Sequence, residues 1–471
     1  MKKDKKPFIH LFRNREDTYL YDVNTDEILE IPENVFENLK QVEYLEEIND
    51  ENVKPYLEDL VSKGFLKESR IEISEHPETP YIKELLNNKL SSIVLQVTQN
   101  CNLRCDYCIY SGSYNNRVHN NKRMSFELAK KAIDFLIDHS KDSKDLHIGF
   151  YGGEPLLEYE LIKKCINYSK TRGRGKKFYF NLTTNGTLLN EEMIEFFEEN
   201  NLTLMFSLDG PKEVHDESRK TIDYKGSFEI LYKNLEMIYK NYNEFYKKHV
   251  IFNTVLNPTR GYYDITNYFK NDELFKKSIF LKSLINTSNL VDKEKYYLDE
   301  KFIEESRYEH FLVLLNKVNL IDENDISPLA KIEGGVIDNF RNHKRTILPK
   351  KGHHGGPCVP GYFRIFVNVD GKFYPCEKVS EISDYATIGN IESGFDFDKV
   401  DEMLNIERYT SKECHNCWAY RYCDICIGKV DASDKTYKKS ILERCDFVRN
   451  ETEAKLKDYC ILKKYRKIVA F

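Results

Sequence analysis

Strand-like and helix-like patterns alternate through the middle of the chain. Apolar runs of strand length predict strands at residues 92–98, 146–151, 178–184, 202–208 and 250–256. Segments with helical spacing of apolar residues lie between them, at residues 125–139, 158–171, 191–200 and 228–239, and a weaker pair ends the series. Repeated strand–helix units predict a parallel sheet with helices outside it. About six strands are too few to close an eight-stranded barrel, so we expect an α/β fold with a partial (β/α)6 barrel over residues 88–290.

The amino-terminal zone has a different pattern. Short β-like runs lie at residues 7–12, 18–23 and 27–31, and two helical stretches follow at 33–41 and 52–63. This combination resembles a winged helix-turn-helix over residues 1–75. Because the zone has neither a basic face nor a charge excess, we expect it to bind a peptide rather than DNA.

The rest of the chain divides into two parts. Residues 291–347 are predicted to form a helical linker. Residues 348–471 are rich in cysteine and contain short hairpin patterns, for example around Gly371. We therefore expect a separate Cys-rich domain at this end.

Composition and charge exclude some classes of function. The chain has 471 residues, of which 41% are hydrophobic and 31% charged, as in ordinary globular proteins of two or three structural units. Its net charge of -6 gives no reason to expect a nucleic-acid partner. No apolar run reaches the length of about 18 residues that a membrane span needs, and the amino terminus has no apolar signal-peptide core. We therefore expect a cytoplasmic protein.

The chain has twelve cysteines, which is unusual in a reducing compartment. Clustered cysteines in such a compartment are more often metal ligands or catalytic groups than disulfides. A first group consists of Cys101, Cys105 and Cys108. A second group consists of Cys358, Cys376, Cys414, Cys417, Cys423, Cys426 and Cys445. Cys165 and Cys460 stand apart, and we expect Cys165 to lie on a buried helix face.

The spacing of the first group is suited to an iron–sulfur cluster with one open iron. Three residues separate Cys101 from Cys105, and two separate Cys105 from Cys108. A fully ligated [4Fe-4S] cube takes four thiolates, so a loop that offers three leaves one iron able to chelate a small molecule. A zinc loop without its fourth ligand is the alternative interpretation.

The surroundings of this loop resemble a known family. The stretch CNLRCDYC after the first barrel strand, followed by YGGEP at residues 151–155, resembles the radical S-adenosylmethionine (radical SAM) superfamily. The resemblance implies that a [4Fe-4S] cluster on Cys101, Cys105 and Cys108 cleaves SAM reductively, and that a 5′-deoxyadenosyl radical then abstracts hydrogen from a substrate. It also implies an external one-electron donor, a flavodoxin or ferredoxin.

The resemblance further implies a SAM site at the carboxyl ends of the strands. The residues that would form it are Tyr107, Gly152, Gly153, Glu154, Pro155, Asn185, Ser207, Asp209 and Arg219. Glu154 would help to hold the methionine amino group, and the two glycines would let the backbone approach a ligand closely. Two other interpretations stay open: the glycines could form an ordinary strand-to-helix turn, and the segment around Arg219 could be a solvated helix start.

The second group resembles the SPASM extension, a module that carries two auxiliary [4Fe-4S] clusters. Carried over position by position, one cluster would be ligated by Cys414, Cys417, Cys423 and Cys445. The other would be ligated by Cys358, Cys376 and Cys426, which leaves it one ligand short. The gap before Cys426 is two residues, where the family pattern has three. A zinc ribbon is the alternative, but its paired motifs usually lie about 15–20 residues apart.

The missing ligand of the second auxiliary cluster has two explanations. His353 and His354 are close in sequence and could fill the place, although both could equally belong to a polar Gly-rich loop. A vacant iron would instead let a substrate thiolate bind directly, because thiolates are strong ligands for such clusters.

As a whole the chain resembles the thioether-forming maturases of ribosomally made peptides, such as those acting on Cys-rich SCIFF or ranthipeptide precursors. This implies a Cys-containing precursor whose leader binds the amino-terminal domain as an added strand. The alternatives are an anaerobic sulfatase-maturating enzyme, which makes formylglycine, a carbon–carbon crosslinking peptide maturase, and a non-enzymatic electron carrier or peptide-binding scaffold. The GGEP-like strand end argues against the last, since electron transfer needs no methionine site.

Overall fold

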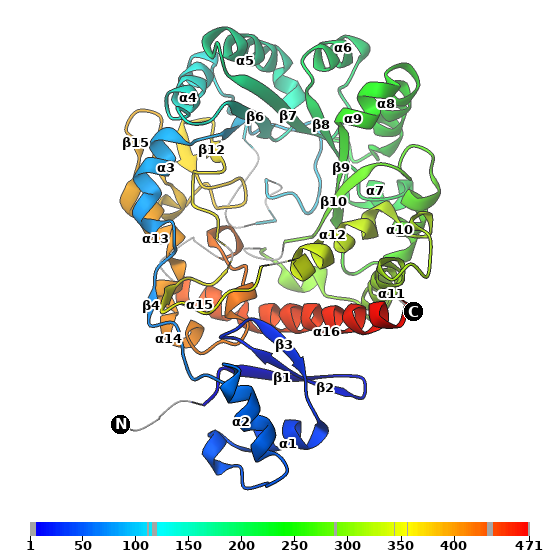
Figure 1. The fold of residues 1–471 in the computed structure, drawn as a ribbon. Coiled ribbons are helices and arrows are strands. Elements are labelled where there is room, and N and C mark those ends of the chain that lie inside the picture. The colour runs from blue at the N-terminus through cyan, green and yellow to red at the C-terminus, as the bar shows by residue number, and fades with distance from the viewer. Residues whose placement is uncertain are drawn as a thin grey trace.

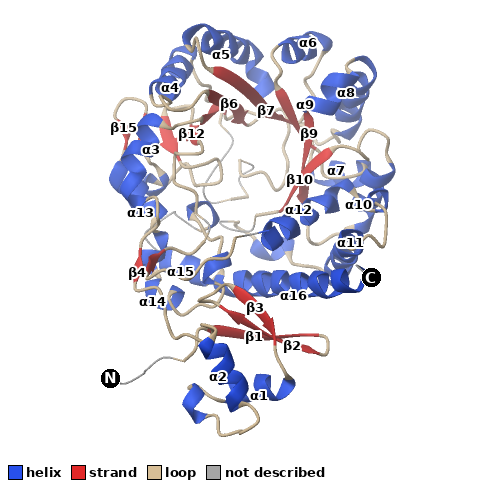
Figure 2. Ribbon diagram, in the orientation of Figure 1, coloured by secondary structure: helices blue, strands red, loops and turns tan. Residues whose placement is uncertain are grey.

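The computed structural model describes residues 6–110, 113–114, 120–286, 290–342, 344–355, 357–430 and 437–469. These residues form an open ring of strands with helices on its outside, and a smaller unit near the amino terminus lies below the ring (Figures 1 and 2). Among the described helices, none combines the length and the apolar character that a membrane crossing requires.

The amino-terminal unit contains the three strands and two helices expected there. Strands β1 (Ile9–Asn14), β2 (Asp17–Asp22) and β3 (Glu27–Glu30) form an antiparallel sheet in chain order. Helices α1 (Glu33–Gln41) and α2 (Lys54–Ser62) follow. Their buried apolar residues pack with Leu20 and Ile31 into one core, which holds this unit together.

Six parallel strands form the wall of the ring, and the predicted α/β arrangement is confirmed. In chain order they are β5 (Ser92–Thr98), β6 (Asp145–Gly152), β7 (Lys177–Thr184), β8 (Thr203–Ser207), β9 (Val250–Leu256) and β10 (Ile279–Leu284). Each of these strands pairs with the next one along the chain. Strands β5 and β10 therefore lie at opposite ends of the parallel run.

Helices cover the outside of this wall (Figure 2). They are α3 (Ile82–Asn88), α4 (Phe126–Asp138), α5 (Tyr159–Arg172), α6 (Glu191–Glu199), α7 (Lys212–Ser218), α8 (Phe228–Asn241), α9 (Asn243–His249) and α10 (Tyr263–Asn271). The sequence pattern did not predict α3, α7 and α9, since seven residues are too few to establish a helical period. Residues along β9 alternate between buried and half-buried positions. Phe252 is buried against Phe275, whereas the next residue, Asn253, is half-buried.

The sheet continues into the cysteine-rich part of the chain. Strand β12 (Ile365–Val367) pairs in parallel with β5, and β13 (Lys372–Tyr374), β14 (Gly389–Asn390) and β15 (Gly394–Phe395) extend it with antiparallel pairs. The hairpin predicted around Gly371 is present, with a φ of +80° at that residue. Its attachment to β5 was not foreseen, because local patterns carry no information on which distant strands pair.

Three long helices, α11 (Glu300–Lys317), α12 (Pro328–Asn342) and α16 (Cys445–Val469), lie on the side of the strand ring that faces the amino-terminal unit (Figure 1). The expected helical linker contains α11 and α12. Helix α16 was not predicted, and it lies between these helices and the amino-terminal sheet (Figure 1). His310 of α11 joins all three, with Nδ1 at 2.7 Å from Glu333 and Nε2 at 2.9 Å from Asp458. Hydrogen bonds to these two carboxylates raise the pKa of His310 to about 10.

Candidate active site and cysteine centres

The first cysteine group lies in the loop at the carboxyl end of β5. Cys105 is buried, and Cys101 and Cys108 are half-buried. Backbone amides donate to two of the sulfurs: Leu103 to Cys101 Sγ at 3.3 Å and Tyr110 to Cys108 Sγ at 3.4 Å. Burial raises the pKa of Cys101 to about 12 and that of Cys105 still further, and the neighbouring thiols of the group add to both shifts. In the bare loop the thiols of Cys101 and Cys105 are therefore neutral, and they would release protons on binding a metal centre.

Gly152 and Gly153 bring the end of β6 against this loop. The Gly153 amide donates to the Thr98 carbonyl at 2.9 Å. A Cβ on Gly153 would lie 2.0 Å from the Asn100 carbonyl oxygen, and a Cβ on Gly152 would lie 2.0 Å from that of Thr98. We expected these glycines to face a ligand; in the structure they face the backbone that leads into Cys101, where only glycine leaves room.

Glu154 is fully buried and ties the ends of β6 and β7 together. Its Oε1 accepts hydrogen bonds from the Leu156 amide at 3.0 Å and the Thr184 hydroxyl at 2.7 Å, and its Oε2 accepts one from the Asn185 amide at 2.8 Å. Burial raises the pKa of Glu154 to about 7 against these donors. A carboxylate offers about four acceptor positions, so one is left for a ligand. The buried Pro155 starts the helical turn that follows.

Asn185 and Ser207 end neighbouring strands of the wall. The Asn185 side-chain amide donates to Asn102 Oδ1 at 2.9 Å and lies 3.9 Å from Cys101 Sγ. It therefore borders the first cysteine group directly. Ser207 ends β8 and its hydroxyl makes no hydrogen bond to any residue that the structure describes.

Tyr107, Asp209 and Arg219 meet in one buried cluster. Arg219 donates from Nε to Asp209 Oδ2 at 2.8 Å and from Nη2 to Oδ1 at 3.2 Å, and the Tyr107 hydroxyl also donates to Asp209. Asp209 is 3% exposed and Arg219 7%, so the interpretation of a solvated helix start is wrong. The Arg219 charge opposes the rise in the pKa of Cys105. The polar groups of these residues bind one another, and Tyr107 joins the cluster to the cysteine loop.

Glu381 belongs to this region, although it was not among the predicted site residues. Its carboxylate accepts hydrogen bonds from the Gln96 side-chain amide at 2.8 and 3.0 Å and from the Tyr110 hydroxyl at 3.0 Å. Gln96 lies on β5, Tyr110 follows Cys108 by two residues, and Glu381 follows Cys376 by five. A single carboxylate thus links the loops of the two cysteine groups.

Within the second group, Cys358, Cys376 and Cys426 form a three-cysteine set. Burial raises the pKa of Cys358 and of Cys376, and the neighbouring Cys426 adds to both shifts, so the three thiols lie within electrostatic range of one another. A Cβ on Gly428 would lie 3.3 Å from Cys376 Sγ and 3.9 Å from Cys426 Sγ. Cys358 is exposed, so this set opens toward solvent.

The other cysteines of the second group form a four-cysteine set. Burial raises the pKa of Cys414, Cys423 and Cys445, and the neighbouring Cys417 adds to all three shifts. All three of these cysteines are half-buried. The two sets have the membership that the resemblance implied for the two auxiliary clusters. Whether each set holds a cluster stays a prediction.

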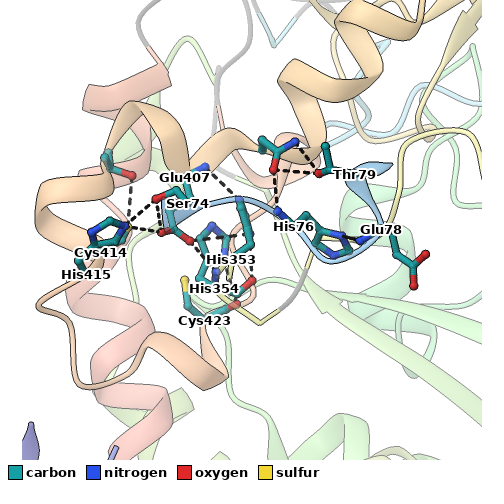
Figure 3. A network of polar contacts seen from close by, with 12 residues as sticks. Ser74, His76, Glu78, Thr79, His353, His354, Glu407, Cys414, His415 and Cys423 are labelled. Atoms are coloured by element: carbon teal, nitrogen blue, oxygen red, sulfur yellow. Dashed lines mark hydrogen bonds and ion pairs between the residues drawn. The ribbon is translucent and has the colours of Figure 1, made fainter. Parts of the chain in front are cut away.

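His353 is not placed to ligate the three-cysteine set. Its Nε2 accepts a hydrogen bond from the Glu407 amide at 3.1 Å, and its Nδ1 donates to the His354 carbonyl at 3.1 Å, so both ring nitrogens are used. His354 has its Nδ1 3.4 Å from the carbonyl of Cys423, a member of the four-cysteine set. Figure 3 shows both histidines near Cys414 and Cys423, two members of the four-cysteine set.

Within the described parts of the chain, no three His, Cys, Asp or Glu side chains converge as ligands of one metal ion. A structural zinc site requires four ligands around a single ion, whereas the cysteines of a cube bind different irons and stand further apart. The amide donors at Cys101 and Cys108 are of the kind that tune such clusters.

The two cysteines outside these groups are interior residues. Cys165 is fully buried in α5, as predicted. Cys460, which had no predicted role, is 4% exposed and packs with Phe12 and Tyr19 of the amino-terminal sheet. Both have a pKa raised to about 12 by burial, so neither is a reactive thiolate.

Comparison with known families matches residues 95–261 to the radical SAM superfamily. This stretch includes the first cysteine group and the strand ends that surround it. Over this stretch the chain is therefore similar to radical SAM domains.

Several characterised proteins are similar over most of the chain. A cysteine-type anaerobic sulfatase-maturating enzyme of Clostridium novyi is 27% identical over 344 residues, covering 71% of this chain and 86% of that protein. A radical SAM cyclopropyl synthase of Paramaledivibacter caminithermalis is 27% identical over 401 residues, covering 82% and 78%. The solved structure of native anSMEcpe with bound AdoMet and Cp18Cys peptide has a TM-score of 0.58 at 22% identity, covering 79% of this chain and 99% of that one. The fold is thus shared with that structure.

Proposed function

We propose that this chain is a radical SAM peptide maturase that forms Cys thioether crosslinks in a ribosomally made precursor peptide. The observation that carries the radical SAM part is the joint position of Cys101, Cys105 and Cys108 beside the Gly152–Glu154 strand end, within the matched region. When bound, the cluster and SAM would supply a 5′-deoxyadenosyl radical that abstracts hydrogen from the substrate. The protein itself would hold, orient and shield the reacting groups.

The residues of the first site have distinct tasks in this proposal. Cys101, Cys105 and Cys108 would ligate the cluster. Glu154 would use its remaining acceptor position for the methionine amino group, and the unbonded Ser207 hydroxyl would face the cofactor. Tyr107, Asp209 and Arg219 would act through the cysteine loop, because their polar groups already bind one another.

The thioether part rests on the three-cysteine set. It has one thiol fewer than a cube needs, and His353 has both ring nitrogens engaged elsewhere. With Cys358 exposed, a peptide cysteine could complete the set as its fourth ligand. The ion pair of Arg364 and Glu377, at 3.0 Å, lies close enough to affect the pKa of both Cys358 and Cys376, and it would form the rim of that entrance.

The amino-terminal unit supports a peptide substrate with a leader. β1 contacts α16 along one side of the sheet, and β3 forms its other edge. An extended leader would add to β3 through backbone hydrogen bonds. A flavodoxin or ferredoxin would supply electrons.

Formylglycine formation on a sulfatase is the second candidate function. The similarity to sulfatase-maturating enzymes favours it, since it extends over 86% of the Clostridium novyi protein. In that case the three-cysteine set would serve only electron transfer.

Anaerobic reconstitution tests the proposal. The wild type should contain about twelve irons per chain and should form 5′-deoxyadenosine with SAM and a reductant. Cys101→Ala, Cys105→Ala and Cys108→Ala should each abolish 5′-deoxyadenosine, and continued cleavage would refute the radical SAM site. With the Cys-containing peptide encoded nearest to the gene, mass spectrometry should show a loss of 2 Da per thioether. Conversion of a sulfatase peptide instead would favour the second candidate.

A further inference from the structure

A buried carboxylate of the amino-terminal unit binds the loop of the four-cysteine set. Asp26 Oδ1 accepts a hydrogen bond from the Tyr21 hydroxyl at 2.8 Å, within its own unit, and another from the Tyr422 hydroxyl at 2.7 Å. Asp26 is fully buried, and Tyr422 directly precedes Cys423. A buried carboxylate is costly without its donors, so Tyr422 is held in place by the fold of the other unit.

Arg421 adds a second set of bonds at the same point. Its Nε donates to the Val23 carbonyl at 2.8 Å and its Nη2 to the Asn24 carbonyl at 3.1 Å, both in the turn between β2 and β3. Nη2 also donates to the Thr346 carbonyl at 2.7 Å. Hydrogen bonds from a charged donor are stronger than those from a neutral donor. The Arg421 side chain therefore binds the four-cysteine loop firmly to the turn between β2 and β3.

A ring contact holds the middle of the loop. Trp418, which directly follows Cys417, stacks on His10 of β1 with ring centroids 3.6 Å apart and planes 5° from parallel. His10 in turn has its Nε2 at 2.9 Å from Glu453 of α16. The stack therefore places Trp418 between the amino-terminal sheet and the long helix.

The segment that leaves the amino-terminal unit contacts the loop of the four-cysteine set at a third place (Figure 3). Ser74, in the short strand β4 (Ile73–Ser74), donates to Glu407 Oε1 at 2.7 Å and lies 2.7 Å from His415 Nε2. His415 follows Cys414 in sequence, and Glu407 is fully buried. The Glu407 Oε2 also accepts the His354 amide at 2.6 Å. This network holds the start of the loop in place. The Trp418 stack holds its middle, and the bonds of Arg421 and Tyr422 hold its end.

The loop has little regular structure of its own. Between residues 411 and 423 it contains only the four-residue helix α14 (Ser411–Cys414) and a three-residue turn at Tyr420–Tyr422. Helical segments this short are not stable alone. The positions of Cys414, Cys417 and Cys423 therefore depend on side-chain contacts from outside the loop.

We infer that the amino-terminal unit is a structural part of the four-cysteine set, and that His10, Asp26 and Ser74 are positioning residues for its thiols. The inference rests on the proposed function only for the nature of the group that the thiols hold. By reciprocity, loading the set should also stabilise the amino-terminal unit.

The thiols can be tested without any metal. Full-length, reduced, metal-free protein is treated with iodoacetamide, and alkylation of each cysteine is followed by peptide mass spectrometry. His10→Ala, Asp26→Asn and Tyr422→Phe should each raise the alkylation rate of Cys417 and Cys423 by about fivefold, the effect of one lost hydrogen bond or ring contact. Asn is tolerated at position 26, where φ is +61°.

Two controls make the result specific. Tyr56→Phe alters a tyrosine that packs within the amino-terminal core, away from the loop, and should change no rate. Cys358 reports on the three-cysteine set and should keep its wild-type rate in every variant. Unchanged rates at Cys417 and Cys423 would overturn the inference, as would an equal rise at Cys358.

The reconstituted enzyme separates this inference from the proposed function. If the four thiols hold a cluster, the same variants should lower the iron content and shift the electron paramagnetic resonance signal of that cluster. If the wild type takes up no iron at these thiols, the proposed function fails there while the alkylation result still decides the inference.

Discussion

The Tyr110 hydroxyl donates to Glu381 at 3.0 Å and so connects two loops that lie 271 residues apart in the sequence. One loop carries the first cysteine group and the other follows Cys376. The separation of these loops is therefore set by a hydrogen bond as well as by the sheet.

Tyr110→Phe should loosen the connection between the two loops without removing the ring. We expect a loss of about 1 kcal/mol in the free energy of unfolding, measured in urea. In the reconstituted enzyme, the ratio of 5′-deoxyadenosine to modified peptide should rise. Tyr224→Phe, at a side chain that is 79% exposed, should match the wild type in both measurements. An unchanged ratio in Tyr110→Phe would show that this hydrogen bond has no part in coupling SAM cleavage to peptide modification.

Gly153→Ala should be among the most damaging small substitutions in the chain. The added methyl group would lie 2.0 Å from the Asn100 carbonyl, so β6 or the cysteine loop must move. We expect a destabilisation of roughly 2 kcal/mol or more, together with loss of iron from the first cysteine group. Gly335→Ala in α12 is the matched control, because a Cβ there meets nothing within 4 Å. It should be neutral or stabilising by about 0.5–1 kcal/mol.

Asp209→Asn should leave the buried Arg219 without a counter-charge. Removing one partner of a buried ion pair costs about 3–5 kcal/mol, which urea unfolding would measure. Glu236→Gln breaks an exposed pair with Lys240 and should cost less than about 0.5 kcal/mol. Equal, small effects of the two substitutions would mean that the Asp209 cluster does not brace the loop.

The contact of His310 with Glu333 and Asp458 should make stability depend on pH. The pKa of His310 is about 10 in the folded protein, above its ordinary value of 6.5, so the folded state binds the proton more tightly. The contribution is complete below about pH 6.5 and is lost as the pH rises toward 10. His310→Gln should therefore destabilise the protein at pH 6 and have a smaller effect at pH 9.5, as measured by urea midpoints. An equal effect at both pH values would contradict this assignment.

Residue types and spacing were enough to predict the barrel and the first cysteine group. The strand at residues 92–98 and its CNLRCDYC loop were located because an apolar run and a dense cysteine spacing are both local. The division of the second group into two sets came from the resemblance to the SPASM extension, because the two sets interleave along the chain. The partners of Glu381, Asp26 and Trp418 could not be predicted, because each contact joins segments more than 270 residues apart.

Some assignments needed burial as well as sequence. Arg219 was compatible with a solvated helix start until its 7% exposure and its bonds to Asp209 were known. His353 looked available as a ligand until both ring nitrogens were found in use. In each case the residue type allowed two roles, and the neighbours decided between them.

The pairing of β12 with β5 constrains how this architecture can be altered or recombined. Because Ile365 lies opposite Ile93, the cysteine-rich module and the barrel share one hydrogen-bonded register. Inserting or deleting a single residue in β12 would displace that module by about 3.3 Å and turn its side chains to the opposite face. A chimera that exchanges this module with that of a relative will therefore keep its geometry only if the crossover points leave the β12 register intact.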